Sequence, residues 1–526
     1  MGLNGFQNLL KIQHKKEDTL FLSGIVSVNT KNNREESALM SIVAPPACEN
    51  QEELSRGEKR RLERQRKKIE KRLNKTGKNN DLDVRFNNKT VSSSATFTFL
   101  EAFKKVMGLN NIIGSNFSMK SYHNQQYSFS ELLEQAIDSL LLGYSRFSHM
   151  QQLKNDPGYK IIKEKERIPD ESTVRKLFPK MQEEQIKSLE KINKVLLQTL
   201  VKMLPPQYIW VDFDDSVITV HGEQENSDAG YNPRYRGRPS YKVKVGFISE
   251  LDLLLKMGLY SGKTASNGDF LPFLKETIEM VKNLGTMVIK GVRMDKGFFD
   301  NKNFEELEEE SIYYVCKVPL RPNIKKMISY VDGTDDWVAL SKTYDYAELT
   351  VPLPSWEKER RFIFIREKIK GKEGSLFSGE VIQYRYEVMV TNIDDMNPEE
   401  VWHCYNKRCD VENRIDELKE GFALDKASQN QFFANYAFAI VKGVAYNILQ
   451  GFKWLLPKEV LPFEAPRVRR TFINQPGNIR GKGRNRYISL PPNSWLEKAI
   501  TIFKRKFSLF KKHLAAIQAL ELLSPV

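Results

Sequence analysis

Apolar and polar residues follow two different periods along this chain, and the change of period divides the sequence. From about residue 95 to 203 the apolar positions have helical spacing, as in "SFSELLEQAIDSLLLGYSRFSHMQQL", which Ser128 or Ser130 can cap. From residue 207 come "YIWVDFDDSVITV", "SYKVKVGFIS" and "LDLLLKMGLY", which predict three strands. A helix, a strand, a short helix and another strand follow, so the order predicts a mixed sheet flanked by helices.

Residues 320 to 395 interrupt this order with further strand-like segments, including "RRFIFIREKI" and "YRYEVMVTNI". One long helix is expected next, because "NPEE" offers Asn397 as an N-cap and Pro398 at the first turn, and Gly421 can end it. One face of this helix is apolar. A narrow polar stripe runs beside that face, and it consists of Tyr405, Arg408, Glu412 and Lys419.

The net charge of the chain indicates the kind of partner that it binds. The chain has 82 Lys and Arg against 67 Asp and Glu, and a net charge of +15 favours a polyanion such as nucleic acid. The helical-looking segment 56–78 alone carries twelve basic and three acidic residues, and segment 467–486 carries seven basic residues and no acidic one. Both are interpreted as DNA-tracking segments, with a solvated arm and a disordered linker as the respective alternatives.

Membrane and secretory classes are disfavoured by the same pattern. The most apolar long segment, "FFANYAFAIVKGVAYNILQGF", is interrupted by polar residues and is interpreted as a buried helix, so no membrane is expected as a partner. The start, "MGLNGFQNLLKIQHKK", lacks a secretory pattern, so the cytoplasm is the expected compartment. The cysteines show neither metal-ligand spacing nor a disulfide framework, which fits reducing surroundings. They are Cys48, Cys316, Cys404 and Cys409.

Carboxylates stand at three places where a metal site can be built. Asp212 and Asp214 point to the same face of the first strand, because side chains alternate along a strand. Asp295 closes the fourth strand, and Glu412 lies on the later helix. Carboxylates that converge from two strands and a helix suit a pair of Mg²⁺ ions acting on a phosphodiester. Spacing alone does not distinguish a metal site from purely structural roles, such as an ion pair between Glu412 and Arg408.

The polar stripe matches, with all four letters in register, the Tyr-x-x-Arg-x-x-x-Glu-x-x-x-x-x-x-Lys signature of insertion-sequence DDE transposases. The block "VDFDDSVITVHGEQENSDAGYNPRYRGRPSY" resembles the first-aspartate region of these proteins, and "RMDKGFF" resembles the second. Other recurrent segments extend the similarity from about residue 128 to 490. The chain is identified as a member of this family, in the branch with a β-rich insertion between the second Asp and the Glu.

The resemblance implies a ribonuclease-H-like core in which Asp214, Asp295 and Glu412 are the catalytic residues and bind Mg²⁺, or Mn²⁺ in its place. The family usually follows its first catalytic Asp with Ser or Thr, whereas Asp215 stands there in this chain. Asp212 and Asp215 therefore remain rivals of Asp214. Asp212 ranks second, because it shares the face of Asp214, while Asp215 is expected on the opposite face.

Candidate DNA contacts form three groups. The resemblance gives the other stripe residues the role of gripping the transposon end. Two basic residues flank Asp295 and can contact the DNA backbone, with plain surface charge as the alternative. In "RGRP", two arginines flank a glycine thin enough to enter an A·T-rich minor groove. In chain order the candidates are Arg236, Arg238, Arg293, Lys296, Tyr405, Arg408 and Lys419.

The implied function is cut-and-paste DNA transposition. The protein would bind the terminal inverted repeats of a mobile element, cleave DNA by two-metal chemistry and transfer 3′-hydroxyl ends to target DNA. Excision through a hairpin is implied by the resemblance alone. The expected partners are double-stranded DNA and a second copy of the chain, since two ends must be paired. A ribonuclease-H-like nuclease without strand transfer and a catalytically silent DNA-binding relic are the alternatives.

The fold class expected from all of this is a multidomain α+β and α/β chain, in which a helical N-terminal DNA-binding region precedes a mixed-sheet catalytic core interrupted by a β-rich insertion. For the helical region, a bundle that only braces the rest is the alternative. The expected regions are an N-terminal segment with a basic helical arm (1–82), a helical DNA-binding domain (83–205), the first part of the core (206–319), the insertion (320–395), the core's charged helix and following helix (396–455), and a basic C-terminal region (456–526).

Overall fold

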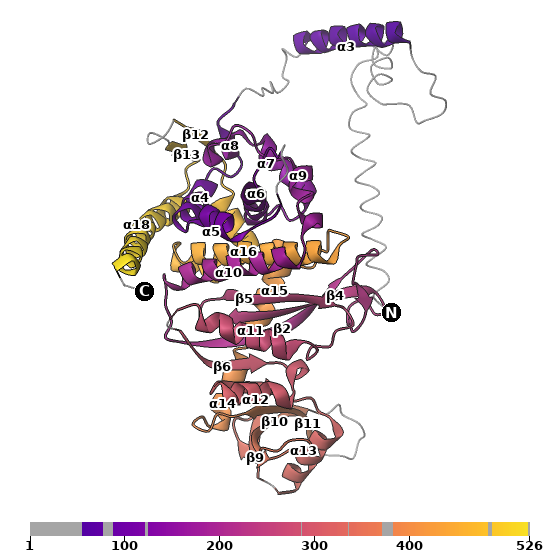
Figure 1. The fold of residues 1–526 in the computed structure, drawn as a ribbon, viewed down its shortest axis with the longest axis vertical. Helices are drawn as coiled ribbons and strands as arrows, with labels where there is room; N and C mark the ends of the chain where they lie inside the picture. Colours follow the sequence, from indigo (N-terminus) through magenta and orange to yellow (C-terminus); the bar gives the residue numbers. More distant parts are fainter. Residues whose placement is uncertain are drawn as a thin grey trace. The chain divides into compact units, whose positions relative to one another are not determined.

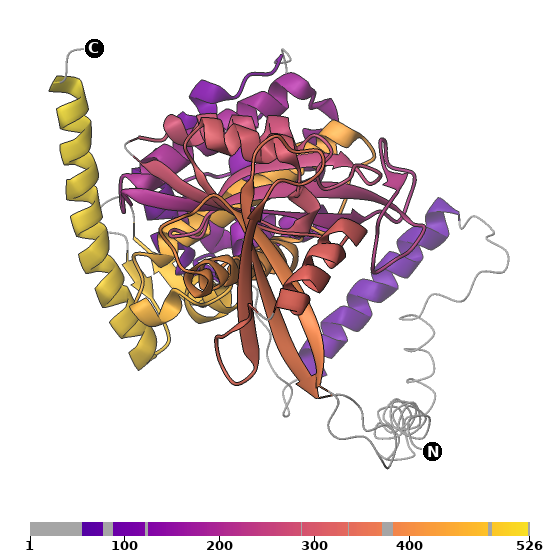
Figure 2. The same cartoon turned by 90° about the horizontal axis from the view of Figure 1, so that it is seen from below.

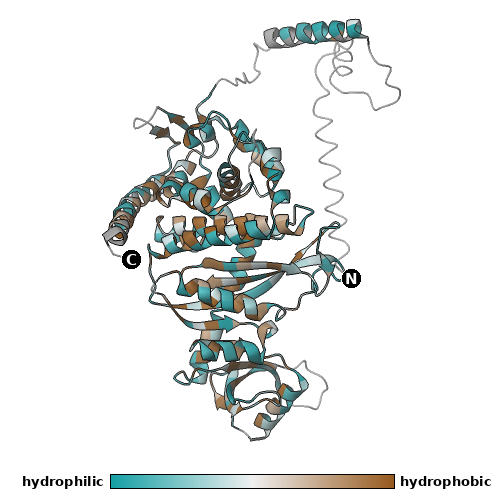
Figure 3. Cartoon of the chain, viewed as in Figure 1, coloured by the Kyte–Doolittle hydropathy of each residue, from teal (hydrophilic) through white to brown (hydrophobic). Residues whose placement is uncertain are grey.

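The computed structural model describes residues 55–76, 88–120, 125–285, 287–334, 336–370, 382–481 and 487–523, in two units that divide after Asn87. The first unit contributes one described helix, α3 (Arg56–Thr76), which lies where the basic arm was expected. Figure 3 shows α3 as almost entirely hydrophilic, and even its Leu62 is exposed. The rest of the expected N-terminal segment and residues 482–486 of the basic C-terminal region lie outside the described residues.

The second unit is built on a mixed sheet, as the strand pattern predicted (Figure 1). Strand β2 runs antiparallel to β4 and parallel to β6, which runs parallel to β7. In spatial order the strands are β3 (Asp228–Ala229), β4 (Pro239–Ile248), β2 (Tyr208–Thr219), β6 (Val288–Met294), β7 (Tyr313–Lys317), β11 (Ile382–Thr391), β10 (Arg360–Lys370), β9 (Tyr344–Val351) and β8 (Val338–Ala339). A further strand, β5 (Leu253–Ser261), also pairs with β4.

Helices surround this sheet and continue beyond it. The ones before the sheet are α4 (Phe97–Val106), α5 (Leu109–Asn116), α6 (Phe129–Leu142), α7 (Gln151–Asn155), α8 (Pro157–Lys163), α9 (Glu171–Arg175) and α10 (Glu183–Val201). Those within and after it are α11 (Phe270–Lys282), α12 (Asn301–Glu309), α13 (Pro322–Thr334), α14 (Pro398–Asn406), α15 (Cys409–Phe422), α16 (Phe432–Lys453), α17 (Ala465–Val468), the π-helix η5 (Arg469–Ile473) and α18 (Ser494–Leu523).

The two faces of the sheet are covered by different helices. Phe213 packs edge-on against Phe270 of α11, whereas Phe247 packs against Tyr446 of α16. Phe247 is the register partner of Asp212, and paired residues share a face while neighbours along a strand alternate. Residues 212 and 214 of β2 therefore face the α16 side, and Phe213 faces α11.

The insertion differs from its prediction in two ways. Its strands do not interrupt the sheet but extend it, because β11 pairs with β7 through Met389 and Lys317. It also contains a helix, α13, that the β-rich prediction missed (Figure 2). The buried residues of α13 are Ile324, Ile328 and Val331, and their spacing of four and three is a helical signal present in the sequence.

The predicted long helix after the insertion is two helices, α14 and α15. Its N-terminus is as predicted, since Asn397 caps α14 in a capping box with Glu400. The break follows from hydrogen bonds that span three residues instead of four: the amide of Arg408 donates to Tyr405 and the amide of Val411 donates to Arg408, both at 2.8 Å. The tightened turn separates Tyr405 from the rest of the polar stripe.

The N-terminal helical region and the C-terminal region form one packed body, although they were predicted as separate regions. Strand β1 (Val91–Ser92) pairs with β12 (Gly477–Arg480), which pairs with β13 (Tyr487–Ser489). The hydroxyl of Thr96 donates to the carbonyl of Ile473 at 2.8 Å. Aromatic side chains of α4, α16 and α18 pack together, and they include Phe99, Phe103, Phe452, Phe503 and Phe510.

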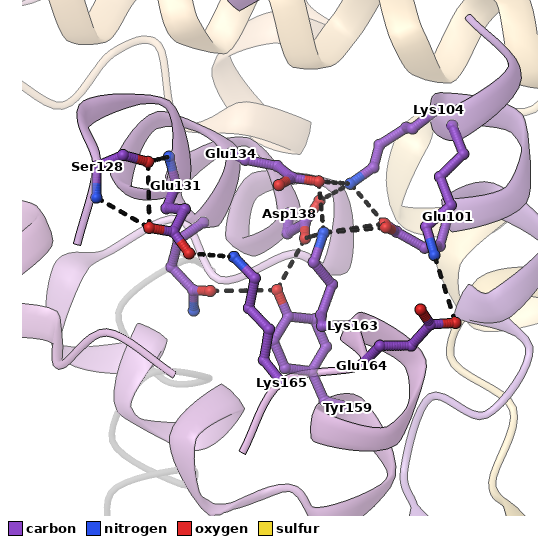
Figure 4. Close-up of polar contacts among 12 residues, drawn as sticks. Glu101, Lys104, Ser128, Glu131, Glu134, Asp138, Tyr159, Lys163, Glu164 and Lys165 are labelled. Carbon is purple, nitrogen blue, oxygen red and sulfur yellow. Dashed lines mark hydrogen bonds and ion pairs between the residues drawn. The ribbon is translucent and has the colours of Figure 1, made fainter. Parts of the chain in front are cut away.

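A buried ion network ties three helices of this body together (Figure 4). Lys104 lies 2.7 Å from Glu101, and Lys163 lies 3.0 Å from Asp138. Three of the carboxylates are close enough to hold a metal ion, but the two ammonium groups already lie among them. Burial alone would raise the pKa of Asp138, and its ion pairs with the lysines lower it instead. The network joins α4, α6 and α8, and its members are Glu101, Lys104, Glu134, Asp138, Tyr159 and Lys163.

The apolar segment predicted as a buried helix is α16. Among the described residues, α16 is the one helix that is both long enough and apolar enough to cross a membrane. However, 83% of its most apolar 18-residue window is buried inside the protein. The polar residues that break its apolar run have partners: Asn447 exchanges two hydrogen bonds with the backbone of Leu254, and Lys442 donates to the carbonyl of Ala423 at 2.8 Å. The prediction of a buried helix is confirmed.

Candidate functional site

Asp214 and Asp295 lie side by side on two parallel strands. Phe213 of β2 is in register with Met294 of β6, so the next residue on each chain, Asp214 and Asp295, comes at the carboxyl end of β6. Burial raises the pKa of Asp214 to about 6, the Arg408 guanidinium opposes this rise, and the charges of Asp215 and Asp295 add to it. The Asp214 carboxylate therefore lies in a buried site near two other carboxylates, those of Asp215 and Asp295.

Arg408 links the two strands to α15. Its guanidinium lies 2.8 Å from Asp214 and 3.6 Å from Glu412. Burial alone would lower the pKa of Arg408, but the charges of Asp214, Asp295 and Glu412 raise it above its usual value. Two of the three carboxylates expected to act together, Asp214 and Glu412, therefore lie beside one guanidinium, and the charge of the third, Asp295, also favours its charged form. The carboxylate oxygens of these residues are the hard donors that Mg²⁺ and Mn²⁺ take as ligands.

Asp212, the second-ranked aspartate, has a different role. Its side chain is completely buried and binds Arg293 through two hydrogen bonds of 2.6 and 3.0 Å. Arg414 of α15 donates to the same carboxylate at 3.2 Å. Both oxygens of Asp212 are therefore occupied by arginines, and the residue anchors α15 to the sheet instead of facing solvent.

Asp215 lies on the other face, as strand alternation predicts. Lys242 of β4 lies 3.1 Å from it, and the neighbouring Lys244 donates to the carbonyl of Ala265 in the loop before α11. Burial lowers the pKa of Lys244 to about 8. These two lysines, which closely follow "RGRP" in the sequence, are buried and offer no charge to the surface.

The candidate DNA contacts divide by exposure. Arg293 is only 2% exposed and is held by Asp212, so it offers no surface to a DNA backbone in this structure. Tyr405 is also buried, in a small apolar cluster with Val315 and Ile363. Lys419 is partly exposed, at 28% of its side chain, beside Asp416. The fully exposed candidates are Arg236 and Arg238, in the loop between β3 and β4, and Lys296.

A cleft of about 840 Å³ opens beside Asp215. It lies where β2 continues past the end of β6, between the β3–β4 loop and the end of α15. Lys419 lines this cleft together with residues that sequence reasoning missed. They were missed because no local pattern in the sequence relates a loop after α6 to the end of α15. The basic and aromatic ones are Arg146, His221, Tyr231, Tyr235 and Lys426, and Arg234, which was expected in the basic loop around "RGRP", lines the cleft as well.

The free energy of unfolding of the metal-free protein should be higher when Asp214 carries no charge. The unfolded chain ionises this group near its usual pKa of 3.8 and the folded chain near 6, so the free energy of unfolding should fall as pH rises from about 4 to 6 and then level off. At pH 7, Asp214→Asn should therefore raise it by about 3 kcal/mol. Urea unfolding at pH 4.5 and 7 measures this, and a lower stability for the variant at pH 7 would contradict the assignment.

The geometry can be compared with known proteins. A family model described as "Transposase DDE domain group 1" matches residues 74–508, which is wider than the expected similarity from about 128 to 490. No curated protein matches the chain. Among solved structures, the cryo-EM structure of the piggyBac transposase synaptic complex with hairpin DNA is similar at 11% sequence identity and a TM-score of 0.36, over 80% of this chain and 83% of that one.

Proposed function

This chain belongs to the transposase DDE domain group 1 family, and from this we propose that it carries out cut-and-paste DNA transposition. It would bind the terminal inverted repeats of its own element, cleave them and join the freed 3′-hydroxyl ends to target DNA. The observation that carries the proposal is that Arg408 joins Asp214 of β2 to Glu412 of α15, while Asp295 follows the adjacent strand β6 one residue after the register pair Phe213–Met294.

The proposed catalytic core is ribonuclease-H-like. The strand order β5-β4-β2-β6-β7, with the first three antiparallel and the last three parallel, supports this assignment. Such a sheet brings the carboxyl ends of two adjacent parallel strands to one edge, where ligands bind in open sheets that contain parallel strands. Asp295 follows the carboxyl end of β6, Asp214 lies beside it within the longer strand β2, and α15 adds Glu412 from the side.

The proposed cofactor is Mg²⁺, with Mn²⁺ as a substitute, held by Asp214, Asp295 and Glu412. When bound, two such ions polarise the scissile phosphate and activate water or a 3′-hydroxyl. The residues fit this group, since all three donors are hard carboxylate oxygens and Glu412 is 66% exposed, free to turn toward a cation. The buried pair of Asp212 with Arg293 holds the strands in register beneath them.

DNA would reach the carboxylates along the exposed basic residues around the cleft. Lys419 lines the cleft, Arg236 and Arg238 are exposed in the β3–β4 loop that contributes to its wall, and Lys296 is exposed just after β6. These residues would supply charge for phosphates, and Arg408 lies deeper, beside Asp214. The helix α3 would add sequence-blind contacts of the same kind. Two copies of the chain would pair the two ends of the element, and the hairpin route of excision remains part of this proposal.

The test places purified protein on a plasmid that carries the gene's own flanking DNA, with Mg²⁺, Mn²⁺ or EDTA. Cleavage at the element boundary that needs the metal, followed by joining of the ends to a second plasmid, is the expected result. Cleavage without joined products would favour a nuclease, and end binding without cleavage would favour a DNA-binding relic.

A further inference from the structure

Arg469 is a buried cation that contacts the ends of two helices. Its Nε and one terminal nitrogen donate to the carbonyls of Leu141 and Leu140 at 2.9 and 2.7 Å, at the end of α6. The other terminal nitrogen donates to the carbonyl of Gly421 at 2.7 Å, at the end of α15. The two helix ends are separated by more than 270 residues in sequence and meet at one guanidinium.

The chemistry of helix ends explains this contact. The last carbonyls of a helix lack intrahelical partners and carry partial negative charge, which a cation satisfies. A planar guanidinium can donate in two directions at once, which an ammonium on a single stem does less well. Burial lowers the pKa of Arg469 to about 10, so the group stays charged at neutral pH. Gly143 leaves room for it, because a Cβ there would lie 3.2 Å from the Arg469 side chain.

Neighbouring caps serve one helix each. The amide of Asn474 donates to the carbonyl of Leu142 at 3.1 Å, at the end of α6. Lys442 donates to the carbonyl of Ala423 at 2.8 Å, just after α15. Arg469 reaches both helices, so the distance between the two ends depends on this side chain more than on either of the other caps.

Both helix ends lead into the walls of the cleft. Ser145 and Arg146 follow α6 closely and line one part of it, and Lys419 and Glu420 of α15 line another. Arg146 is exposed at this wall of the cleft. The separation of Arg146 from Lys419 is therefore set behind the cleft, at the point where Arg469 joins the two helices.

We propose that Arg469 is a positioning residue that fixes the separation of these two walls, so that Arg146 and Lys419 bind phosphates of the same DNA strand on its path to the carboxylates. This inference rests on the proposed function and adds Arg146 to its DNA contacts. Lys cannot reach both helix ends from position 469, so Arg469→Lys keeps the charge and loses the bridge.

The test measures binding of a duplex carrying the gene's flanking sequence over a range of salt concentrations. Arg146→Ala should reduce the slope of log affinity against log salt by about 1, the loss of one phosphate contact, and Arg469→Lys should reduce it by about 1 to 2. The double variant should be no worse than Arg469→Lys, because the misplaced Arg146 no longer contributes. Cleavage by Arg469→Lys should fall at least tenfold at saturating DNA.

Lys506→Met is the matched control, since Lys506 caps the end of α16 through Trp454 and Leu456, away from the cleft. It should leave the salt slope unchanged. A folded Arg469→Lys with the wild-type slope, or additive effects in the double variant, would overturn the proposal. If Arg469→Lys does not fold, an unchanged slope for Arg146→Ala overturns it equally. A wild type that binds the duplex and never cleaves it would contradict the proposed function and leave this binding test valid.

Discussion

Glu412→Gln is expected to abolish DNA cleavage while DNA binding and folding stay intact. The substitution keeps the size of the side chain and removes one carboxylate from the proposed metal site. Glu412 is two-thirds exposed and forms a long ion pair of 3.6 Å with Arg408, so little stability depends on it. Loss of a ligand that acts on the scissile phosphate should lower the cleavage rate by at least about 10³-fold, or about 4 kcal/mol.

The comparison needs a carboxylate on the same helix that is outside the proposed site. Asp410 is exposed in the first turn of α15, and Asp410→Asn should cleave within about twofold of the wild type, since exposed surface changes have small effects. The plasmid cleavage rate and the duplex affinity are measured for both variants. If Glu412→Gln cleaved DNA as fast as the wild type, Glu412 would not belong to the proposed metal site. If its DNA affinity fell as much as its cleavage rate, Glu412 would be assigned to DNA contact instead.

Asp212→Ala is expected to destabilise the fold by about 3 to 5 kcal/mol, because it leaves a buried arginine without its counter-charge. Arg414 would keep its second partner, Asp252, at 2.6 Å. Arg293 would keep only neutral acceptors, the carbonyl of Cys404 at 3.0 Å and the hydroxyl of Ser249. Urea unfolding of the metal-free protein at pH 7 gives the free energy of unfolding.

Asp214→Asn serves as the control for this result, since it lies two residues away on the same face and is expected to change stability in the opposite direction. Adding Mn²⁺ should stabilise the Asp212 variant if it folds, and should not stabilise Asp214→Asn to the same extent. If Asp212→Ala were as stable as the wild type and lost Mn²⁺ binding, Asp212 would replace Asp214 in the proposed metal site.

Local patterns in the sequence were sufficient for much of the fold and part of the site. Runs of β-branched, aromatic, apolar or alternating residues predicted the strands that became β2, β4, β5, β6 and β7, because such side chains fit a buried or half-buried sheet. The capping box at Asn397 was predicted because both of its partners lie within four residues. The residues proposed as catalytic, Asp214, Asp295 and Glu412, came from resemblance, since nothing local links a strand residue to a helix far along the chain.

The sequence by itself therefore determined the order and kind of most elements, the basic character of the chain and the residue types available for a metal site. Only the tertiary structure decided which aspartate of "DFD" is open. Asp212 and Asp214 share a strand face, and the difference between them is made by Arg293 on the adjacent strand and by Arg414, 202 residues after Asp212. Burial and ion pairing depend on neighbours in space, and the same holds for Arg469, whose three partners come from two distant helices.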